Sequence, residues 1–373
     1  MIKVAIIGVG NCASALVQGI NYYKHRNETD VPGVMYPEIG GYKATDIEVV
    51  AAFDVDERKV GKSLKEAIFA GPNNTRVFHT DIDDDVVVVQ GPRNDSIGDH
   101  MMDSHDEINF QPLPDYQSSE AKVVDVLKAS GADVVINYLP VGSQKATENY
   151  ALCAIEAGVP FLNCIPVFLA SDPAWAKKFA DAKLPIIGDD MKSQFGASIF
   201  SQIIQETLFS RGHTVNFHQQ LNVGGNTDFL NMVDQSRLSS KRISKENVIR
   251  SQNDIRKIPV PKDGIYAGPS SFIPYLKDNK VAHIRVEAEG FGGSPVEIDV
   301  KLSVQDSPNS AGVVIDAIRF LKVAHEMTVK GPIAGASAWT QKSPPKQMTF
   351  EDAKKECDAL SQRKLTQTLW YGT

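Results

Sequence analysis

The sequence contains few cysteines and no long apolar segment. Cysteine occupies only 4 of its 373 positions, Cys12, Cys153, Cys164 and Cys357, without any CxxC spacing. This pattern argues against a disulfide framework or a cysteine-rich zinc site and indicates buried thiols. No stretch reaches the roughly 18 apolar residues of a membrane span, and MIKVAIIGVG lacks the cationic region of a secretory signal. We therefore expect a cytoplasmic protein that does not enter a membrane.

Positive charge is also in the minority. Lys and Arg number 39 against 46 Asp and Glu, which gives a formal net charge of −7. This balance argues against a generally cationic nucleic-acid or membrane binder, but it permits a small positive pocket for an anionic substrate. The histidines have no ligand spacing such as HExxH, so a zinc hydrolase is not expected.

The order of apolar patterns indicates an α/β protein with two domains. Short apolar runs alternate with helical periodicity as far as residue 212, which predicts a Rossmann-like parallel sheet with helical crossovers. One of the expected helices covers residues 57–69. From 281 to 305, apolar and mostly charged residues alternate strictly, which is typical of antiparallel strands with one solvated face. We therefore expect an α/β domain from 1–212 and 306–373, with an inserted α+β domain at 213–305.

The segment IIGVGNCAS has the pattern of a dinucleotide-binding loop. Gly8, Gly10 and Ala13 have GxGxxA spacing between a predicted strand and a predicted helix, where a pyrophosphate can approach the backbone and the helix N-terminus. Asp54 ends the second predicted strand, where a carboxylate accepts ribose hydroxyls and disfavours a 2′-phosphate, so NAD is preferred to NADP. It lies 41 positions after Ala13 rather than the usual ~20, and a loop at 21–45 accounts for the excess. A glycine turn in an ordinary α/β protein is the alternative.

Two further stretches are compatible with an anionic ligand. GDDMKSQFGAS (188–198) joins a predicted strand to a helix and offers backbone NH groups to a phosphate, although a helix cap by Asp190 or Ser193 explains it equally well. Lys241 and Lys245 share one face if SSKRISKEN is helical. In a partly desolvated pocket, such lysines can transfer protons and stabilise an enolate. Considered alone, two lysines so placed more often form a solvated cationic helix face than a catalytic pair.

Longer motifs resemble the myo-inositol-1-phosphate synthase family in its shorter bacterial and archaeal form. They keep the family's order nearly from end to end: VGNCAS, GDDMKS, NVGGNTDFLNM, SSKRISKEN, PYLKDNKVAHI, QDSPNSAG and WTQKSPP. The resemblance implies an NAD-binding domain, an inserted domain for catalysis and tetramerisation, and a role in inositol and phospholipid biosynthesis. Enzymes of this family isomerise D-glucose 6-phosphate to 1L-myo-inositol 1-phosphate. NAD⁺ oxidises C5, enolisation lets C6 attack the C1 aldehyde, and NADH then reduces C5 again.

The resemblance also implies roles for individual residues. The catalytic positions are Lys241, Lys245, Lys280, Lys342 and Asp306, the last as the acidic partner that orients a lysine. Lys241 and Lys342 are expected to serve proton transfer and oxyanion stabilisation, whereas Lys245 and Lys280 hold the phosphate and the enolate oxygen. The expected substrate contacts are Ser193, Gln194, Gly196, Ala197, Asn226 and Asp228. The expected cofactor contacts are Gly8, Gly10, Asn11, Cys12, Ala13, Asp54, Asn137, Leu139, Pro140 and Asp189.

Several points stay open at the level of the sequence. The phosphate loop reads KSQFGAS, whereas longer eukaryotic relatives carry KSGQT, so the amide donors cannot be copied across. The family is divided between members that need a divalent cation and members assisted by ammonium; DIDDD (81–85) is better explained as a solvated acidic loop than as a metal site. An NAD-dependent dehydrogenase acting on a phosphorylated sugar or polyol is the alternative enzyme. An NAD-sensing or scaffold protein whose second domain only oligomerises is the non-enzymatic alternative.

Overall fold

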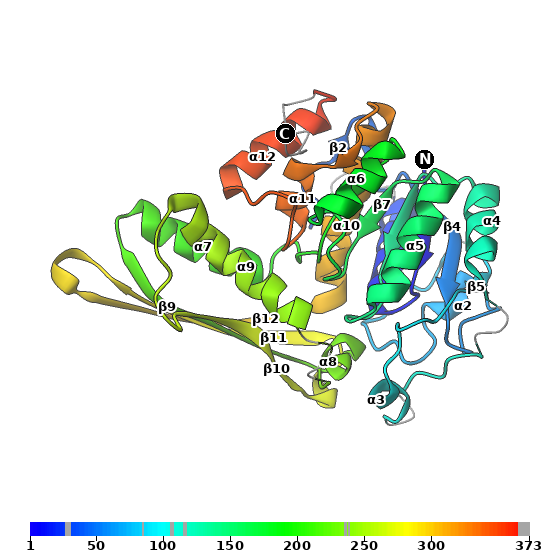
Figure 1. The fold of residues 1–373 in the computed structure, drawn as a ribbon. Helices are drawn as coiled ribbons and strands as arrows, with labels where there is room; N and C mark the ends of the chain where they lie inside the picture. Colours follow the sequence, from blue (N-terminus) through cyan, green and yellow to red (C-terminus); the bar gives the residue numbers. More distant parts are fainter. Residues whose placement is uncertain are drawn as a thin grey trace.

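The computed structural model describes residues 1–26, 31–83, 86–104, 108–114, 118–234, 237 and 239–364, without the side chains of 239–242, 269 and 270. The chain forms two layered units that meet side by side (Figure 1). One is built on a parallel sheet, and the other is a smaller sheet that extends away from it under two helices.

Among the described residues, the larger sheet has seven strands in the order β13-β8-β7-β6-β1-β4-β5, and all its pairings are parallel. The strands are β1 (Ile2–Ile7), β4 (Ile47–Asp54), β5 (Val88–Gln90), β6 (Val134–Asn137), β7 (Phe161–Asn163), β8 (Pro185–Ile187) and β13 (Gly331–Pro332). The predicted α/β class with a parallel sheet is confirmed. Strand order reverses between β1 and β6, and ligands of such sheets bind at the carboxyl ends of the strands at this point.

Helices cover both faces of this sheet because its strands are apolar on both sides. In β1, Val4 and Ile6 pack in one core cluster, whereas Ala5 and Ile7 pack in the other. The first cluster includes residues of α1 (Asn11–Arg26), α10 (Asp306–Glu326), α11 (Ala334–Thr340) and α12 (Phe350–Ser361). The second includes residues of α4 (Glu120–Ser130), α5 (Gln144–Ala157) and α6 (Pro173–Asp181). Strand patterns with apolar residues on both faces therefore place the sheet between two helical layers.

Shorter elements complete the larger unit. They are β2 (Glu38–Ile39) and β3 (Tyr42–Lys43), which form a hairpin, and the one-turn helices α2 (Leu64–Ala67) and α3 (Asp99–Met102). The helix predicted over 57–69 is wrong in extent, because only α2 within it is helical. Gly61 has φ +78°, outside the right-handed helical region, and so breaks the segment before α2.

The smaller sheet has four strands in the order β10-β9-β11-β12 among the described residues. They are β9 (Thr214–Gly224), β10 (Ile265–Phe272), β11 (Asn279–Glu289) and β12 (Pro295–Gln305). The predicted antiparallel pairing within 281–305 is confirmed, since β11 pairs with β12 from Asn279↔Gln305 to Glu289↔Pro295. Helices α7 (Ala197–Ser210) and α9 (Ser239–Arg256) cover one face of this sheet (Figure 1). Because α7 belongs to this layer, the layer begins before residue 213; the domain division itself stays a prediction.

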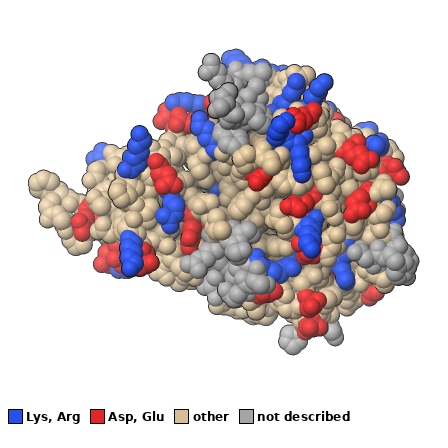
Figure 2. Space-filling view, in the orientation of Figure 1, with Lys and Arg blue, Asp and Glu red and all other residues tan. Residues whose placement is uncertain are grey.

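Charge is dispersed over the face of the molecule shown in Figure 2. On the face shown in Figure 2, Lys and Arg side chains alternate with Asp and Glu side chains and do not form one positive field. None of the described helices is long and apolar enough to cross a membrane. The short helix α8 (Thr227–Asn231) and the 3-10 turns η3 (Pro274–Leu276) and η4 (Phe291–Gly293) complete the described elements.

Candidate active site

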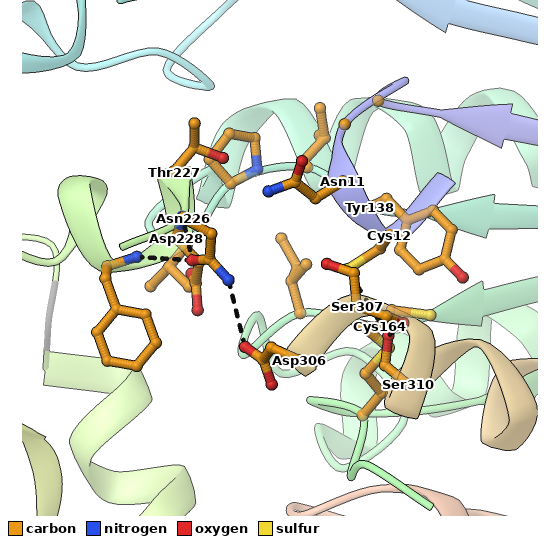
Figure 3. A pocket seen from close by; sticks show the side chains of 18 of the residues that line it. Asn11, Cys12, Tyr138, Cys164, Asn226, Thr227, Asp228, Asp306, Ser307 and Ser310 are labelled. Atoms are coloured by element: carbon orange, nitrogen blue, oxygen red, sulfur yellow. Dashed lines mark hydrogen bonds between the residues drawn. The ribbon is translucent and has the colours of Figure 1, made fainter. Parts of the chain in front are cut away.

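A pocket lies where the carboxyl ends of the parallel strands meet the smaller sheet. Side chains from both units face this cavity (Figure 3). The predicted residues that line it are Gly8, Gly10, Asn11, Cys12, Asp54, Leu139, Pro140, Ser193, Gly196, Ala197, Asn226, Asp228, Lys245, Lys280, Asp306 and Lys342. Tertiary folding therefore brings the glycine loop, the 193–197 segment and three of the four predicted lysines to one cavity.

The glycine loop has the geometry that a dinucleotide needs. Gly8 has φ +88°, and a Cβ atom there would lie 2.9 Å from the carbonyl oxygen of Tyr138, so only glycine fits without strain. The carboxylate of Asp54 accepts the N–H of Val9 at 2.7 Å and is thereby fixed beside the loop. This arrangement of a close-packed glycine turn and a carboxylate at the next strand end fits the pyrophosphate and ribose of NAD.

A buried lysine supports the same loop and also lines the pocket. The Nζ atom of Lys59 donates to the carbonyl oxygen of Val9 at 2.8 Å and to Oδ1 of Asn73 at 3.0 Å. Burial lowers the pKa of Lys59, and the nearby carboxylates of Asp54 and Asp56 oppose that effect. No motif pointed to Lys59, because its role depends on a turn that brings it back to residue 9.

On the opposite wall, an acidic and amide cluster holds one of the lysines. Lys280 donates to the carboxylate of Asp306, and both side chains are largely buried. The Nδ2 atom of Asn226 lies 3.4 Å from Oδ2 of Asp306 and 3.1 Å from Oδ1 of Asp278 (Figure 3 shows the former). Asn226 is also the N-cap of α8, where its Oδ1 accepts the N–H of Asp228 at 3.1 Å. The cap therefore fixes the amide that bridges the two carboxylates.

Asp278, which the motifs did not single out, lies just behind this wall. Its side chain is 1% exposed and accepts hydrogen bonds from Thr75, Asn226 and Ser307. Burial, followed by the negative charge of Asp306, raises the pKa of Asp278. The hydrogen bonds act in the opposite direction and allow a second carboxylate to lie near Asp306.

Lys342 is held by the loop that follows β8. Its Nζ donates to Oδ1 of Asp190 at 2.9 Å and to the carbonyl oxygen of Met191 at 2.8 Å. The backbone N–H of Lys342 also donates to the carbonyl oxygen of Asp190 at 2.7 Å, so the two segments are joined side by side. Asp190 is 1% exposed and lines the pocket. The sequence pattern indicated only a helix cap for Asp190, whereas in the structure it is the partner of a predicted catalytic lysine.

Two further lysines, Lys192 and Lys245, lie in the same region. Lys245 on α9 lines the pocket and is 8% exposed, whereas the side chain of Lys241 lies outside the described residues. Lys192 is buried and donates to the carbonyl oxygen of Ala338 at 2.7 Å. Burial, together with the charge of Lys342, lowers the pKa of Lys192 to about 7.

Four predicted contacts are not among the described residues that line the pocket, and their role as contacts stays a prediction. The carboxylate of Asp189 is buried among donors of residues 163 and 169–171, which fixes that turn, and burial raises its pKa to about 6. Asn137 donates to Thr147 and Asn163 inside the sheet layer. Gln194 donates to Asp316, and Ala13 is fully buried in the core behind the loop. Position next to a motif was not sufficient to predict these side-chain directions.

A metal ion is not supported by the described side chains. Among them, no group of three or more His, Cys, Asp or Glu is placed to hold one. Asp84 and Asp85 of the DIDDD segment lie outside the described residues. The expected assistance by a divalent cation or ammonium stays a prediction, and we derive no step through a metal.

Comparisons with known proteins agree on one family. The family model described as myo-inositol-1-phosphate synthase matches residues 196–307. Inositol-3-phosphate synthase of Mycolicibacterium smegmatis is 48% identical over 361 residues, which cover 96% of this chain and 97% of that protein. The enzyme of the same name from Corynebacterium glutamicum is 44% identical, over 96% of this chain and 98% of its own. A myo-inositol-1-phosphate synthase-related protein from Thermotoga maritima superimposes with a TM-score of 0.80 at 25% identity, covering 98% of this chain and all of that one.

Proposed function

The chain belongs to the myo-inositol-1-phosphate synthase family, and we propose that it converts D-glucose 6-phosphate to 1L-myo-inositol 1-phosphate with NAD that is regenerated in every turnover. As a member of this family it is an isomerase of inositol biosynthesis. The observation that carries the proposal is that the glycine loop with Asp54 and the lysines 245, 280 and 342 line one pocket. A dehydrogenase needs the cofactor-binding glycine loop with Asp54, but an aldol cyclisation also needs the lysines.

The substrate phosphate fits best at the start of α7. Gly196 is the N-cap of this helix, so the first backbone N–H groups point out of the helix end, and Lys245 lines the same pocket. A helix N-terminus and an ammonium group both attract an anion. We assign Ser193, Gly196 and Ala197 to phosphate binding, with Lys245 as the counter-charge.

The remaining lysines are suited to the charges that develop during ring closure. NAD bound at the glycine loop would accept hydride from C5 and later return it. Lys280, oriented by Asp306, is assigned to the enolate oxygen, and Asn226 and Asp228 to sugar hydroxyls. Lys342, fixed by Asp190, is assigned with Lys241 to proton transfer and oxyanion stabilisation at C5 and C1. Preorganised donors of this kind typically contribute a hundredfold or more, on the order of 3 kcal/mol.

A product assay separates the isomerase from a net dehydrogenase. The purified protein is incubated with glucose 6-phosphate and NAD⁺, the product is identified by NMR, and absorbance of the reduced nicotinamide is followed. The isomerase yields a non-reducing sugar phosphate while the absorbance stays flat. NADH that accumulates in proportion to the substrate consumed would contradict the proposal and support the dehydrogenase.

The choice of NAD over NADP tests the role of Asp54. Its carboxylate lines the pocket and is fixed by the N–H of Val9, so a 2′-phosphate would meet a fixed negative charge. Asp54→Asn keeps the shape and removes the charge. We expect the ratio of the NADP to the NAD dissociation constant to fall about tenfold in the variant, which corresponds to loss of ~1.4 kcal/mol of repulsion. An unchanged ratio would remove Asp54 from cofactor selection.

We also propose that residues 1–212 and 306–373 bind NAD, whereas 213–305 serve catalysis and assembly into a homotetramer. The proposal is supported by the sheet face that α7 and α9 leave uncovered. On this face Arg285 bonds to Glu287, Glu297 and Asp299. Light scattering at working concentration tests the assembly, and a monomer would contradict it.

A further inference from the structure

A short segment between the two units contacts both walls of the pocket. It consists of Asn73, Asn74 and Thr75, which follow α2 and are here called the NNT segment. Asn73 bonds to the glycine-loop side, because its Nδ2 donates to the carbonyl oxygens of Val9 at 3.1 Å and Ile68 at 3.0 Å. Asn74 and Thr75 form hydrogen bonds to two regions that are far apart in the sequence.

The first of these regions is the start of α1 in the glycine loop. Oδ1 of Asn11 accepts the backbone N–H groups of Asn74 at 2.8 Å and Thr75 at 3.1 Å. Nδ2 of Asn11 donates to Oδ1 of Asn74 at 2.9 Å. Asn11 is 7% exposed and lines the pocket next to Gly10, so the NNT segment fixes the side chain that follows the second glycine.

The second region is the wall that carries Lys280 and Asp306. Nδ2 of Asn74 donates at 3.0 Å to the carbonyl oxygen of Gly225, the residue before Asn226. The hydroxyl of Thr75 donates at 2.5 Å to Oδ2 of Asp278, which shares Asn226 with Asp306. Thr75 is 8% exposed and Asp278 is 1% exposed, so water does not readily replace this bond.

We propose that Asn74 and Thr75 are positioning residues that hold the glycine loop and the Lys280–Asp306 wall at one relative placement, so that C5 oxidation and ring closure act on the same bound sugar. This inference rests on the proposed function. Hydride transfer requires C5 beside the nicotinamide, whereas enolisation and aldol closure require C6 and C1 beside the lysines. A displacement of about 1 Å between reacting groups can cost about a hundredfold in rate.

Loosening the contacts of Asn74 and Thr75 should therefore slow ring closure more than C5 oxidation. Oxidation moves a hydride from C5 to NAD⁺ and releases the proton of the C5 hydroxyl, which leaves a C5 ketone. If the ketone leaves before closure, one NADH remains for every molecule that escapes. The ratio of NADH to inositol phosphate thus measures the alignment of the two walls, and mere loss of folded protein does not change it.

The test compares two substitutions at position 75 that differ in whether they keep the hydroxyl. Thr75→Val removes the hydroxyl and keeps the shape, whereas Thr75→Ser keeps the hydroxyl. For Thr75→Val we expect kcat per folded protein to fall about tenfold, the scale of a lost hydrogen bond to a charged group, and the NADH ratio to rise above that of the unsubstituted protein. Thr75→Ser should restore both values to near those of the unsubstituted protein.

Asn73→Ala is the control within the same segment. In the structure Asn73 bonds to Val9, Ile68 and Lys59, all on the glycine-loop side. This variant should weaken NAD binding in calorimetry without raising the NADH ratio. A ratio that stays at the unsubstituted value in Thr75→Val, or rises equally in Asn73→Ala, would overturn the proposal. Should Thr75→Val not fold, Asn74→Ala is judged by the same ratio.

The unsubstituted protein is assayed first, and this separates the two hypotheses. Without inositol phosphate from the unsubstituted protein, the proposed function fails. With that product formed and the NADH ratio unaffected by Thr75→Val, only the positioning role fails.

Discussion

Replacing Lys342 by methionine should affect stability and catalysis through two different contacts. The side chain of Lys342 is 13% exposed, and its ammonium pairs with Asp190, whose side chain is 1% exposed. Methionine retains most of the apolar stem and removes the charge. The substitution leaves the Asp190 carboxylate in place without the Lys342 ammonium and also removes the hydrogen bond to the carbonyl oxygen of Met191.

The stability loss follows from the buried carboxylate. Removing one partner of a buried ion pair costs about 3–5 kcal/mol, because the remaining charge keeps its desolvation penalty. The partial exposure of Lys342 favours the lower end, so we expect Lys342→Met to lower the free energy of unfolding by about 3 kcal/mol. Asp190→Asn, added to it, removes the remaining charge and should restore most of that loss.

Turnover should behave differently. If Lys342 stabilises an oxyanion or transfers a proton, kcat should fall more than about a hundredfold in the single variant, and the second substitution should not restore it. Urea unfolding measures the stability, and inositol phosphate formation per folded protein measures the turnover. A folded Lys342→Met protein with near-normal turnover would remove the residue from the mechanism. A double variant no more stable than the single one would refute the assignment of the loss to the buried carboxylate.

Three further predictions concern other parts of the molecule. Lys245→Met should reduce kcat/KM for glucose 6-phosphate at least about a hundredfold while NAD binding in calorimetry is unchanged, since Lys245 is assigned to the sugar phosphate; a comparable loss of NAD binding would contradict this. Burial lowers the pKa of His218 to about 4, so the unfolded chain binds more protons between that value and ~6.5 and stability falls as the pH falls through this range. Urea unfolding of His218→Leu should therefore show about 2 kcal/mol less loss of stability between pH 7 and pH 5 than the unsubstituted protein, and equal losses would refute the reasoning. Arg285→Glu places a fourth carboxylate among Glu287, Glu297 and Asp299, so light scattering should show a smaller assembly if this face joins subunits, and an unchanged mass would exclude that role.

Much of the larger unit could be predicted because its signals are local. Consecutive residues carry the two-residue period of a strand or the 3.6-residue period of a helix, and the apolar strands bounded by turns predicted a parallel sheet. The glycine spacing placed Gly8 at a turn where the structure has φ +88°. The helix expected over 57–69 was wrong in extent because a positive φ at Gly61 breaks it, and apolar spacing does not report a residue's dihedral angles.

The site could be predicted as a set of residue types, but its pairings could not. Motif order indicated that Lys280, Lys342 and Asp306 belong together, and the structure brings them to one cavity. Which of two adjacent aspartates faces that cavity was decided by the fold: Asp189 bonds to the turn at 169–171, whereas Asp190, at φ +62°, bonds to Lys342. A side chain's direction in a loop depends on partners that arrive from elsewhere in the chain.

Local patterns in the sequence were sufficient to predict most strands and helices of the larger unit, the glycine turn and the resemblance to the family. Contacts between distant segments, such as Thr75 with Asp278 and Asn11 with Asn74, became visible only in the folded chain. The difference follows from the range over which each kind of interaction acts. Apolar periodicity and turn chemistry act between near neighbours, whereas these hydrogen bonds form only after distant segments have packed together, and the bond of Thr75 to Asp278 also needs the two units to meet.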